Sequence, residues 1–531
     1  MAWGRARDTF VALNPTFPIE DVTVTRAADR DPQFAGVWYP AKPVEAQARY
    51  LLPNEAPASA RELSAAGWRP VAAGCDGDLT ATVWQRPVPT DASAQEAGRR
   101  SGYAAAALLA LDHEPAWAAF RFPADGDPTA RSYLLQRLPA VFADAGPILR
   151  RLDVEDDLSA QRALILALGE LPLPAVPPAE VDALRGKLML LYRTHPDAGM
   201  HGALDWLLRR RWKWPDVWAF DAECAARARA AQVVRALPDA VPLGPLGPLG
   251  AMRRALPPRG PTDSDWFVNG EGQTFAVVRG PVEFTMGTPT NEPQRYGSEV
   301  QHRKRIPRTF AIATREVTVA EYNRSLSAPQ PFNPYAPVPD APVLMAWYDA
   351  AEYCNWLSAR EGIPPDQWCY EPNAQGRYAE GMKIKQGHLK LTGYRLSTEA
   401  EWEFACRAGS RTSRPFGRGD ELLSRYAWFI KTAGDRTHPT GLLRPNERGL
   451  FDILGNAGEW NENPNLSYAT NQLDDIEDAA HLVLQDRLTR AIRSGTFFNY
   501  TNILRSGNRN FNGPGSRTVS DGFRVARTLP D

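Results

Sequence analysis

The stretch GYRLSTEAEWEFACRAG, Gly393 to Gly409, decides the fold of the C-terminal half of this chain. Thr398 stands three residues before Glu401, which is the spacing of a capping box at the start of a helix. In that motif a hydroxyl and a carboxylate each accept a hydrogen bond from a free backbone N–H group. Trp402 and Cys406 then follow at helical spacing and are expected to face the core. The stretch therefore predicts a capped amphipathic helix.

Two further stretches belong to the same frame. In YDAAEYCNWLS, Tyr348 to Ser358, apolar residues recur on one helix face. In LGNAGEWNEN, Leu454 to Asn463, two glycines, Gly455 and Gly458, stand where a loop needs backbone angles that other residues avoid. These motifs are interpreted as structural, because each has a role in building the fold that requires no chemistry.

Bulk composition excludes several classes of protein. The 531 residues are enough for three or four domains, and 61 Lys plus Arg against 62 Asp plus Glu leave a net charge of -1. Such a balance gives no attraction to nucleic acid or to an anionic membrane. Five cysteines without a CxxC pair predict neither a disulfide framework nor a zinc knuckle. No secretory signal and no long apolar run is recognised, so a cytoplasmic location is expected.

The first 236 residues divide into two regions. Residues 1–95 are predicted to form a small α+β region, with strands at Phe34–Ala41 and Leu79–Pro87. Residues 96–236 are predicted to be helical, with three similar segments that begin at Asp127, Asp157 and Asp197. Each Asp is a candidate N-cap. The repetition resembles HEAT-like helical repeats, which stack to bury their apolar stripes and often bind a partner. A helical spacer without a partner is the alternative.

Residues 237–263 are rich in proline and glycine, which predicts an exposed linker. Such a segment is a preferred site of proteolysis. A regulated cleavage site that would release the two halves is a second interpretation of the same composition.

Six blocks between 264 and 531 resemble, in order and spacing, the formylglycine-generating-enzyme (sulfatase-modifying factor) family. They include EFTMGTPTNE, FAIATREVTVAEY, the stretches quoted above, and RAIRSGTFFNYTNILRSGNRNFNGPGSRTVSDGFRVART. The resemblance implies a C-type-lectin-like domain over 264–531. The expected fold class is therefore α+β, with this domain preceded by a central helical repeat region and a small N-terminal α+β region.

The resemblance also implies a calcium site in DILGNAGEW, with ligands from Asp452, Gly455, Ala457 and Glu459. Carboxylate and carbonyl oxygens are the ligands that Ca²⁺ prefers. A local structural role for Glu459 is the alternative. A second calcium site of the family falls near Trp428, which offers no side-chain oxygen, so that site is expected to be lost.

The oxidases of this family use two cysteines that bind copper, and these positions fall on Asn499 and Leu504 here. Neither side chain offers the soft sulfur that Cu(I) requires. A related branch holds iron with an HxxxHxE motif, and none of the seven histidines has that spacing. We therefore expect neither copper nor iron and no catalytic residues.

The last block supplies the candidate binding surface. Aromatic, Asn and Arg side chains of this kind form adaptable contacts at low entropic cost. The residues expected to make contact are Phe498, Asn499, Tyr500, Asn502, Asn508, Asn510, Phe511, Asn512 and Arg517. Variable proteins of diversity-generating retroelements place ligand-binding residues in the matching stretch. Solvation of a loop-rich surface, without any ligand, is the other interpretation.

The sequence thus predicts a non-catalytic protein-binding regulator or adaptor. The resemblance places such domains beside Ser/Thr kinases and caspase-like proteases in bacterial signalling or defence, and the chain has no kinase motif of its own. A divergent metal-dependent oxidase and a ligand-binding variable protein are the alternatives.

Overall fold

The computed structural model describes residues 91–142, 144–171, 181–236, 264–330, 333–468 and 484–530, together with six strands and residues 60, 61 and 63 before them. The predicted linker 237–263 lies outside the described residues. Two compact units are present, Met1–Ala94 and Gln95–Asp531. Within the part of the chain that is described, no helix combines the length and the apolar character needed to cross a bilayer.

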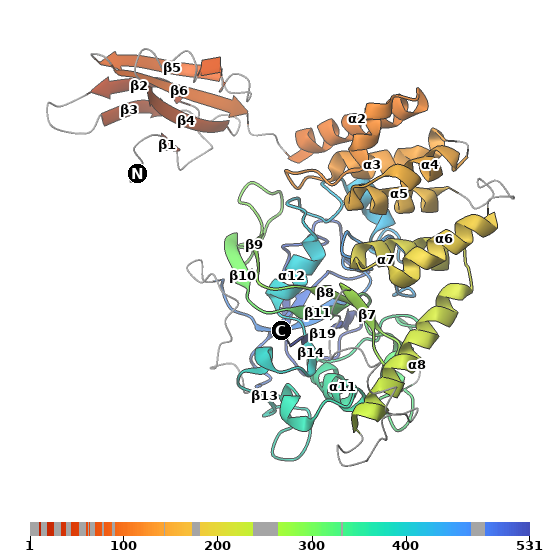
Figure 1. Cartoon of the computed structure of the whole chain (residues 1–531). Helices are drawn as coiled ribbons and strands as arrows, with labels where there is room; N and C mark the ends of the chain where they lie inside the picture. The colour runs from red at the N-terminus through yellow and green to blue at the C-terminus, as the bar shows by residue number, and fades with distance from the viewer. Residues whose placement is uncertain are drawn as a thin grey trace, which may run out of the picture. The chain divides into compact units, whose positions relative to one another are not determined.

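The described residues of the first unit include six strands (Figure 1). Four of them form an antiparallel sheet in the order β1-β4-β6-β5, and β2 pairs with β3 in a separate hairpin. The stretch expected to form the second strand coincides with β6, and the other overlaps β3. Their bounds are β1 (Phe10–Val11), β2 (Ile19–Thr25), β3 (Gln33–Trp38), β4 (Val44–Leu51), β5 (Arg69–Asp76) and β6 (Leu79–Pro87).

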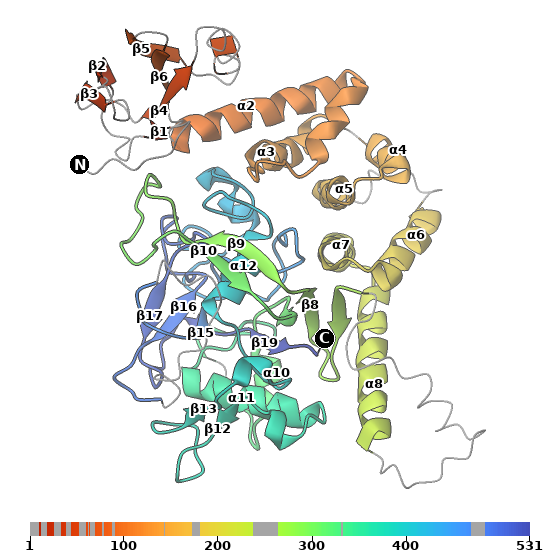
Figure 2. The ribbon, with the colours of Figure 1, turned by 60° about the vertical axis from the view of Figure 1, so that its left-hand side comes forward.

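The second unit begins with a helical layer. Figure 2 shows α3, α5 and α7 in a row next to the C-terminal domain, with α4 and α6 outside that row. The three segments that repeat in the sequence are the helices of this inner row. The bounds are α2 (Asp91–Ala110), α3 (Thr129–Arg137), α4 (Gly146–Val154), α5 (Leu158–Glu170), α6 (Val181–Thr194), α7 (Ala198–Asp205) with a π-helical turn over Trp206–Arg211, and α8 (Asp216–Ala236).

Two of the three predicted N-caps are confirmed. The carboxylate of Asp157 accepts from the Ala160 N–H at 2.9 Å, and that of Asp197 accepts from the Met200 N–H at 2.7 Å. Asp127 differs, because Pro128 occupies the N-cap position of α3. The Asp127 carboxylate accepts a hydrogen bond from the Thr129 N–H instead, at 3.1 Å.

The C-terminal domain is built around an antiparallel five-stranded sheet in the order β14-β19-β11-β8-β7. The last strand of the chain, β19, pairs with β11 and β14, so the sheet closes only when the C-terminus is in place. A four-stranded sheet, β17-β16-β15-β18, carries the final loops, and β9–β10 and β12–β13 form hairpins.

The strands of this domain are β7 (Trp266–Val268), β8 (Thr274–Val278), β9 (Val282–Met286), β10 (His302–Ile306), β11 (Phe310–Ala313), β12 (Tyr370–Glu371), β13 (Lys383–Ile384), β14 (Tyr394–Leu396), β15 (Gly458–Pro464), β16 (Arg490–Arg493), β17 (Asn510–Asn512), β18 (Asp521–Gly522) and β19 (Val525–Thr528). Its α-helices are α10 (Val319–Asn323), α11 (Trp347–Arg360) and α12 (Glu399–Arg407).

The predicted capping box opens α12. The Thr398 hydroxyl accepts from the Glu401 N–H at 3.2 Å, while the Glu401 carboxylate accepts from the Thr398 N–H at 2.9 Å. Trp402 and Cys406 are fully buried, as expected. The helix has no exposed acidic face, however, because the side chains of Glu399, Glu401 and Glu403 are buried as well. Each of these carboxylates forms an ion pair with arginine.

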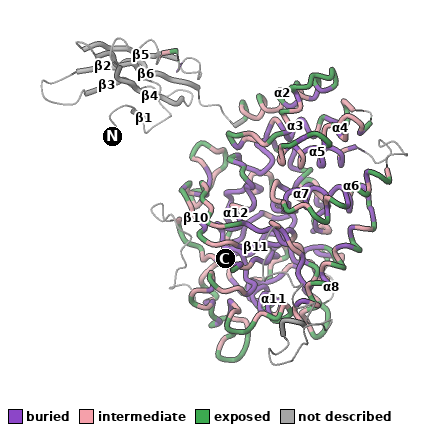
Figure 3. Tube along the Cα trace, in the orientation of Figure 1, coloured by how far each residue is buried: buried purple, intermediate pink, exposed green. Residues whose placement is uncertain are grey.

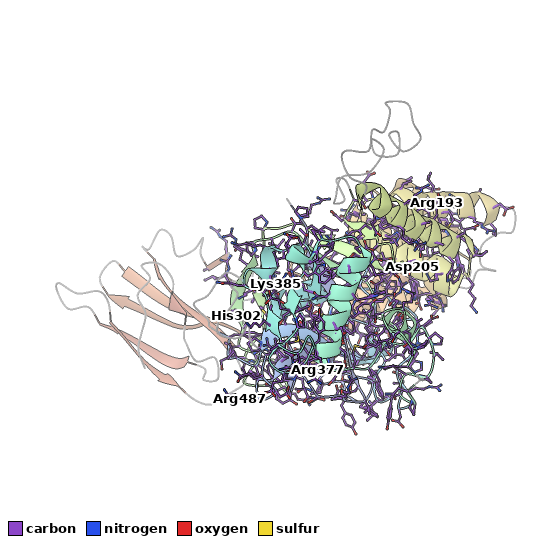
Figure 4. The ribbon with its side chains drawn as sticks, turned by 90° about the horizontal axis from the view of Figure 1, so that it is seen from below. Arg193, Asp205, His302, Arg377, Lys385 and Arg487 are labelled. Carbon is purple, nitrogen blue, oxygen red and sulfur yellow. The ribbon has the colours of Figure 1, made fainter. Side chains whose placement is uncertain are left out.

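The helical layer and the C-terminal domain share one hydrophobic core. Buried residues continue from the layer into the domain in Figure 3, and one cluster contains side chains of both. Two glycines of α7 allow the closest approach. A Cβ atom at Gly199 would lie 2.1 Å from the Glu447 carbonyl oxygen, and one at Gly202 would lie 2.4 Å from the Gly449 Cα atom. Only glycine fits at such contacts between two backbones.

We expect Gly202→Ala to destabilise the folded protein by about 1–3 kcal/mol, because the methyl group would force α7 away from the turn at Gly449. Gly186→Ala is the matched control. Gly186 lies within α6 with no atom within 4 Å of an added Cβ. That change should leave stability unchanged or raise it by up to about 1 kcal/mol through helix propensity. Chemical unfolding of the two variants measures both effects, and equal stability of the two would contradict the close approach.

An aromatic stack fixes the start of the C-terminal domain to the helical layer. His201 lies between Trp266 and Tyr192, with ring centroids 3.5 Å and 4.3 Å away. The Trp266 indole N–H donates to the His195 carbonyl at 2.8 Å. Burial lowers the pKa of His201 to about 4. The charged groups that face this imidazole are Asp205, Arg209 and Arg315. The stack therefore requires a neutral His201.

A stability loss in acid follows from the lowered pKa of His201. Between pH 6.5 and 4 the unfolded chain takes up the proton more readily than the folded chain, so stability falls as the pH falls through this window. The contribution of His201 amounts to roughly 2–4 kcal/mol at the low end. Unfolding free energies measured at pH 7 and at pH 4.5 should therefore differ less in His201→Gln than in the natural protein. His113→Gln, at an exposed position, should leave the difference unchanged.

Candidate functional site

Asn456, in the LGNAGEW stretch, holds three loops together. Its backbone N–H donates to the Trp428 carbonyl, and its own carbonyl accepts from the Phe497 N–H, both at 2.9 Å. Its side-chain oxygen accepts from the His438 N–H at 2.9 Å. Asn456 is fully buried and has a φ of 57°, a conformation that asparagine tolerates better than most residues. The motif therefore positions surface loops rather than reacting groups.

The loops joined in this way, with the segment that follows Phe497, carry several partly or fully exposed aromatic rings, which we name the aromatic loop surface. It consists of Tyr335, Trp428, His438, Phe498 and Tyr500. Tyr335 and Phe498 meet edge to face with centroids 5.7 Å apart, and Trp428 stacks on His438 at 3.8 Å. Tyr500 is 64% exposed, while the other four are partly exposed. These side chains come from segments separated by up to 165 residues.

The residues beneath the aromatic loop surface are held by packing and by backbone hydrogen bonds. Phe497 is fully buried and packs against Phe498 with centroids 4.1 Å apart. The Thr437 N–H donates to the Tyr335 carbonyl at 2.8 Å, and the Ile430 N–H donates to the Asn499 carbonyl at 3.2 Å. The rings thus stand on backbone segments that are bonded to one another.

Asn499 and Leu504, where the family resemblance places the copper cysteines, have structural roles. The Asn499 side-chain oxygen accepts from the Thr496 N–H at 2.8 Å and so closes a turn. Leu504 is fully buried, and a Cβ atom at Gly495 would lie 2.8 Å from its Cδ2 atom. One position therefore stabilises a loop, and the other fills the core.

The other predicted contact residues do not join the aromatic loop surface in a single site. Asn502 lies on the turn before Arg505, whose guanidinium donates to its carbonyl at 2.6 Å. Asn508 is buried and donates to Glu299 at 3.2 Å, so it belongs to no exposed surface. Arg517 is exposed and pairs with Asp349 of α11 at 2.7 Å.

Strand β17 carries the remaining three predicted contact residues. Asn510 is exposed, and Phe511 and Asn512 are partly exposed. The side-chain oxygens of Asn510 and Asn512 accept from the backbone N–H groups of Phe511 and Gly513, each at 2.9 Å. The guanidinium carbon of Arg509 lies 4.8 Å from the centre of the Phe511 ring. The structure therefore divides the predicted contact residues among separate elements.

Sequence reasoning missed Tyr335, Trp428 and His438, because nothing local marks them as neighbours of the last block. Trp428 was noted only as a residue that cannot ligate calcium. A signal was nevertheless available, since aromatic residues in loops of low regularity are expected to pack on other loops.

The predicted calcium residues lie among buried carboxylates. Both oxygens of Glu459 accept from Arg524 at 2.6 Å, and Oε2 also accepts from the Trp402 indole at 2.7 Å. Asp452 accepts from the Gly441 N–H at 2.6 Å through one oxygen, while its other oxygen is buried without a hydrogen-bond partner. The Gly455 carbonyl accepts from Ser494 at 3.0 Å. Glu459 is therefore committed to Arg524 and Trp402, and of the two predicted carboxylate ligands only Asp452 has an oxygen without a partner.

Glu316 completes this cluster. Its carboxylate accepts from the Ala457 N–H at 2.9 Å and from the Asn456 amide at 2.8 Å. Burial, followed by the charges of Asp452 and Glu459, raises the pKa of Glu316 well above its usual range. Burial likewise raises the pKa of Asp452. Within the described residues no three His, Cys, Asp or Glu side chains gather as a metal site, so calcium here would rely on backbone carbonyls such as that of Ala457.

The cysteines of the domain lack the properties of reactive thiols. Cys354, Cys369 and Cys406 are fully buried, and burial raises the pKa of Cys369 and that of Cys406 to about 12. Burial also raises the pKa of Cys354 well above the usual range. A protonated, enclosed thiol is a poor nucleophile and a poor metal ligand.

Comparison with known proteins assigns the C-terminal half. Residues 270–529 match the model of the sulfatase-modifying factor enzyme 1-like domain. Three relatives are each 31% identical: a chaperone protein LppX of Paenibacillus barcinonensis, a serine/threonine-protein kinase pkn1 of Chlamydia caviae, and a formylglycine-generating enzyme of Streptomyces coelicolor. The similarity covers 22%, 27% and 26% of this chain, and 49%, 22% and 48% of the relatives, respectively. The chain thus spans about half the length of these relatives or less.

Among solved structures, variable protein 1 of Treponema denticola is 23% identical, with a TM-score of 0.41. The match covers 48% of this chain and 95% of that one.

Proposed function

We propose that this chain, whose C-terminal half is a sulfatase-modifying factor enzyme 1-like domain, is a non-catalytic protein-binding regulator or adaptor. The proposal rests most on the expectation, drawn from the family resemblance, that the copper-binding thiols would fall on Asn499 and Leu504. The Leu504 side chain is fully enclosed in the core, and the Asn499 side chain is used in a turn. The buried thiols Cys354, Cys369 and Cys406 offer no substitute.

The aromatic loop surface is the proposed contact site. Rings that are held by their backbones lose little conformational entropy on binding, and exposed Tyr and Phe supply large contact areas. Tyr500 is the most exposed of these side chains, and Phe498 and Tyr335 pack edge to face on backbone segments that are bonded to one another. Arg517 and the residues of β17 provide a second patch that the same partner could reach.

A bacterial signalling or defence role, with a Ser/Thr kinase or a caspase-like protease as the partner, is the finer form of the proposal. Three of the relatives carry the name serine/threonine-protein kinase pkn1. In those proteins the aligned part is 22% of the chain. A domain of this type within a kinase chain supports the idea that this chain acts together with a kinase.

The contact site is tested by Phe498→Ala combined with Tyr500→Ala. Proteins captured by the tagged full chain are identified, and the strongest candidate is purified for direct binding measurements. Loss of two supported rings should weaken binding at least about tenfold, corresponding to about 1.4 kcal/mol or more. Leu190→Ala removes a 62% exposed apolar side chain from α6 and serves as the control. Unchanged affinity in the double variant would rule out the aromatic loop surface as the contact site.

A divergent metal-dependent oxidase is the second candidate, favoured by the relatives named formylglycine-generating enzyme. Metal analysis of the purified protein separates the two candidates. We expect no copper or iron, and stoichiometric amounts of either metal would overturn the non-catalytic assignment.

The same measurement tests the proposed calcium site. Stoichiometric calcium that disappears in Asp452→Ala would support it, because Asp452 has a free acceptor oxygen. Full retention of calcium by that variant would place the ion elsewhere.

A further inference from the structure

Glu447 anchors the C-terminal domain to two inner helices of the helical layer. Its carboxylate pairs with Arg131 of α3 and, at 3.1 Å, with Arg162 of α5. Arg162 also donates to the Glu447 carbonyl at 2.8 Å. The side chains of Arg131 and Glu447 are only 5% and 14% exposed, so solvent screens their attraction weakly. Arg131 is itself held, since it donates to the Phe120 carbonyl at 2.7 Å.

Further ion pairs cross the same boundary on either side of Glu447. Glu170, at the end of α5, pairs with Arg444 at 2.6 Å and with Arg425 at 3.4 Å. Arg444 and Glu170 are 1% and 6% exposed. Asp127, ahead of α3, pairs with Arg418 at 2.9 Å. The charges therefore lie along two of the inner helices, α3 and α5.

Backbone groups join the two parts as well. The Trp206 indole donates to the Leu442 carbonyl at 3.3 Å, and Arg210 donates to the Thr440 carbonyl at 2.9 Å. The Arg411 N–H donates to the Gly126 carbonyl at 2.8 Å. These bonds satisfy buried polar groups that would lose their partners if the two parts separated.

Separation of the two parts would therefore be costly. It would expose the apolar cluster that both parts share. It would also break charge pairs such as Arg444 with Glu170, which are aligned and almost fully enclosed only while the two parts are together. None of these interactions requires a covalent connection between residues 236 and 264.

We propose that the helical layer, residues 95–236, and the C-terminal domain, residues 264–530, remain bound as one non-covalent particle when the chain is cut between 237 and 263. The inner face of the layer is a docking surface whose occupant is this chain's own C-terminal domain. A cut at this position does not release the two halves, and a partner of the layer must use its outer face. The proposal goes beyond the protein-binding function and does not depend on it.

The experiment inserts a specific protease recognition sequence after Gly247 in the full chain. The folded protein is cut to completion, as judged on a denaturing gel, and then analysed by size-exclusion chromatography with light scattering at micromolar and at roughly tenfold lower concentrations. We expect one peak with the mass of the uncut chain and with both fragments in it, at 0.1 M and at 0.5 M NaCl. Two separate peaks at either salt concentration overturn the proposal.

Glu447→Arg tests the contact itself, because it places a third cation beside Arg131 and Arg162. After the same cut, its fragments should separate at concentrations at least about tenfold higher than those of the parent. Glu371→Arg, a charge reversal at an exposed position of β12, should behave like the parent. If Glu447→Arg does not fold, the cut parent protein alone decides the proposal. Fragments of Glu447→Arg that stay together as firmly as those of the parent would contradict the role of Glu447.

Discussion

The buried pairing of carboxylates with arginines around α12 is the constraint on which the C-terminal domain depends. Glu399 and Glu403 lie one helical turn apart, and Arg493 of β16 binds both. Glu401 lies on the opposite side of the helix, where Arg395 of β14 and Arg308 bind it. One short helix is thereby fixed to both sheets of the domain through charges that are almost entirely removed from water.

Such pairs contribute more to the choice of one structure than to stability. Removing two charges from water costs nearly as much as their attraction returns, yet a single unpaired charge in the same place is strongly unfavourable. Any packing that misaligned β14 or β16 with α12 would leave a buried arginine or glutamate without its ion-pair partner. Glu459 and Arg524 apply the same constraint between β15 and the stretch before β19. The loops can therefore vary in sequence while the frame remains fixed.

How far the sequence predicted the structure depended on how local each signal was. The capping box of Thr398 and Glu401, the N-caps Asp157 and Asp197, and the strand at Leu79–Pro87 depend on neighbouring residues, and they were confirmed. The burial of Glu399 and Glu403 depends on arginines about 90 to 110 residues away, which the helical periodicity of the stretch does not indicate. Within the aromatic loop surface, Phe498 and Tyr500 lie in the block that the sequence singles out, whereas Tyr335 and Trp428 come from loops far away in the sequence and are joined to it by ring packing and by the hydrogen bond of Asn456.

The repetition at Asp127, Asp157 and Asp197 left open whether the helices bind a partner or form a spacer, and in the structure their inner row packs against the C-terminal domain. Arg131 of α3 and Arg162 of α5 both pair with the carboxylate of Glu447. Gly199 and Gly202 of α7 pack closely against the backbone of the same turn. Similar sequences arise here because three helices face one common surface within the chain. A repeated apolar stripe consequently indicates that something covers it, but it does not indicate whether the cover is another protein or the next domain. The protein-binding surface is therefore better sought where rigid backbones present rings to solvent than where helices repeat.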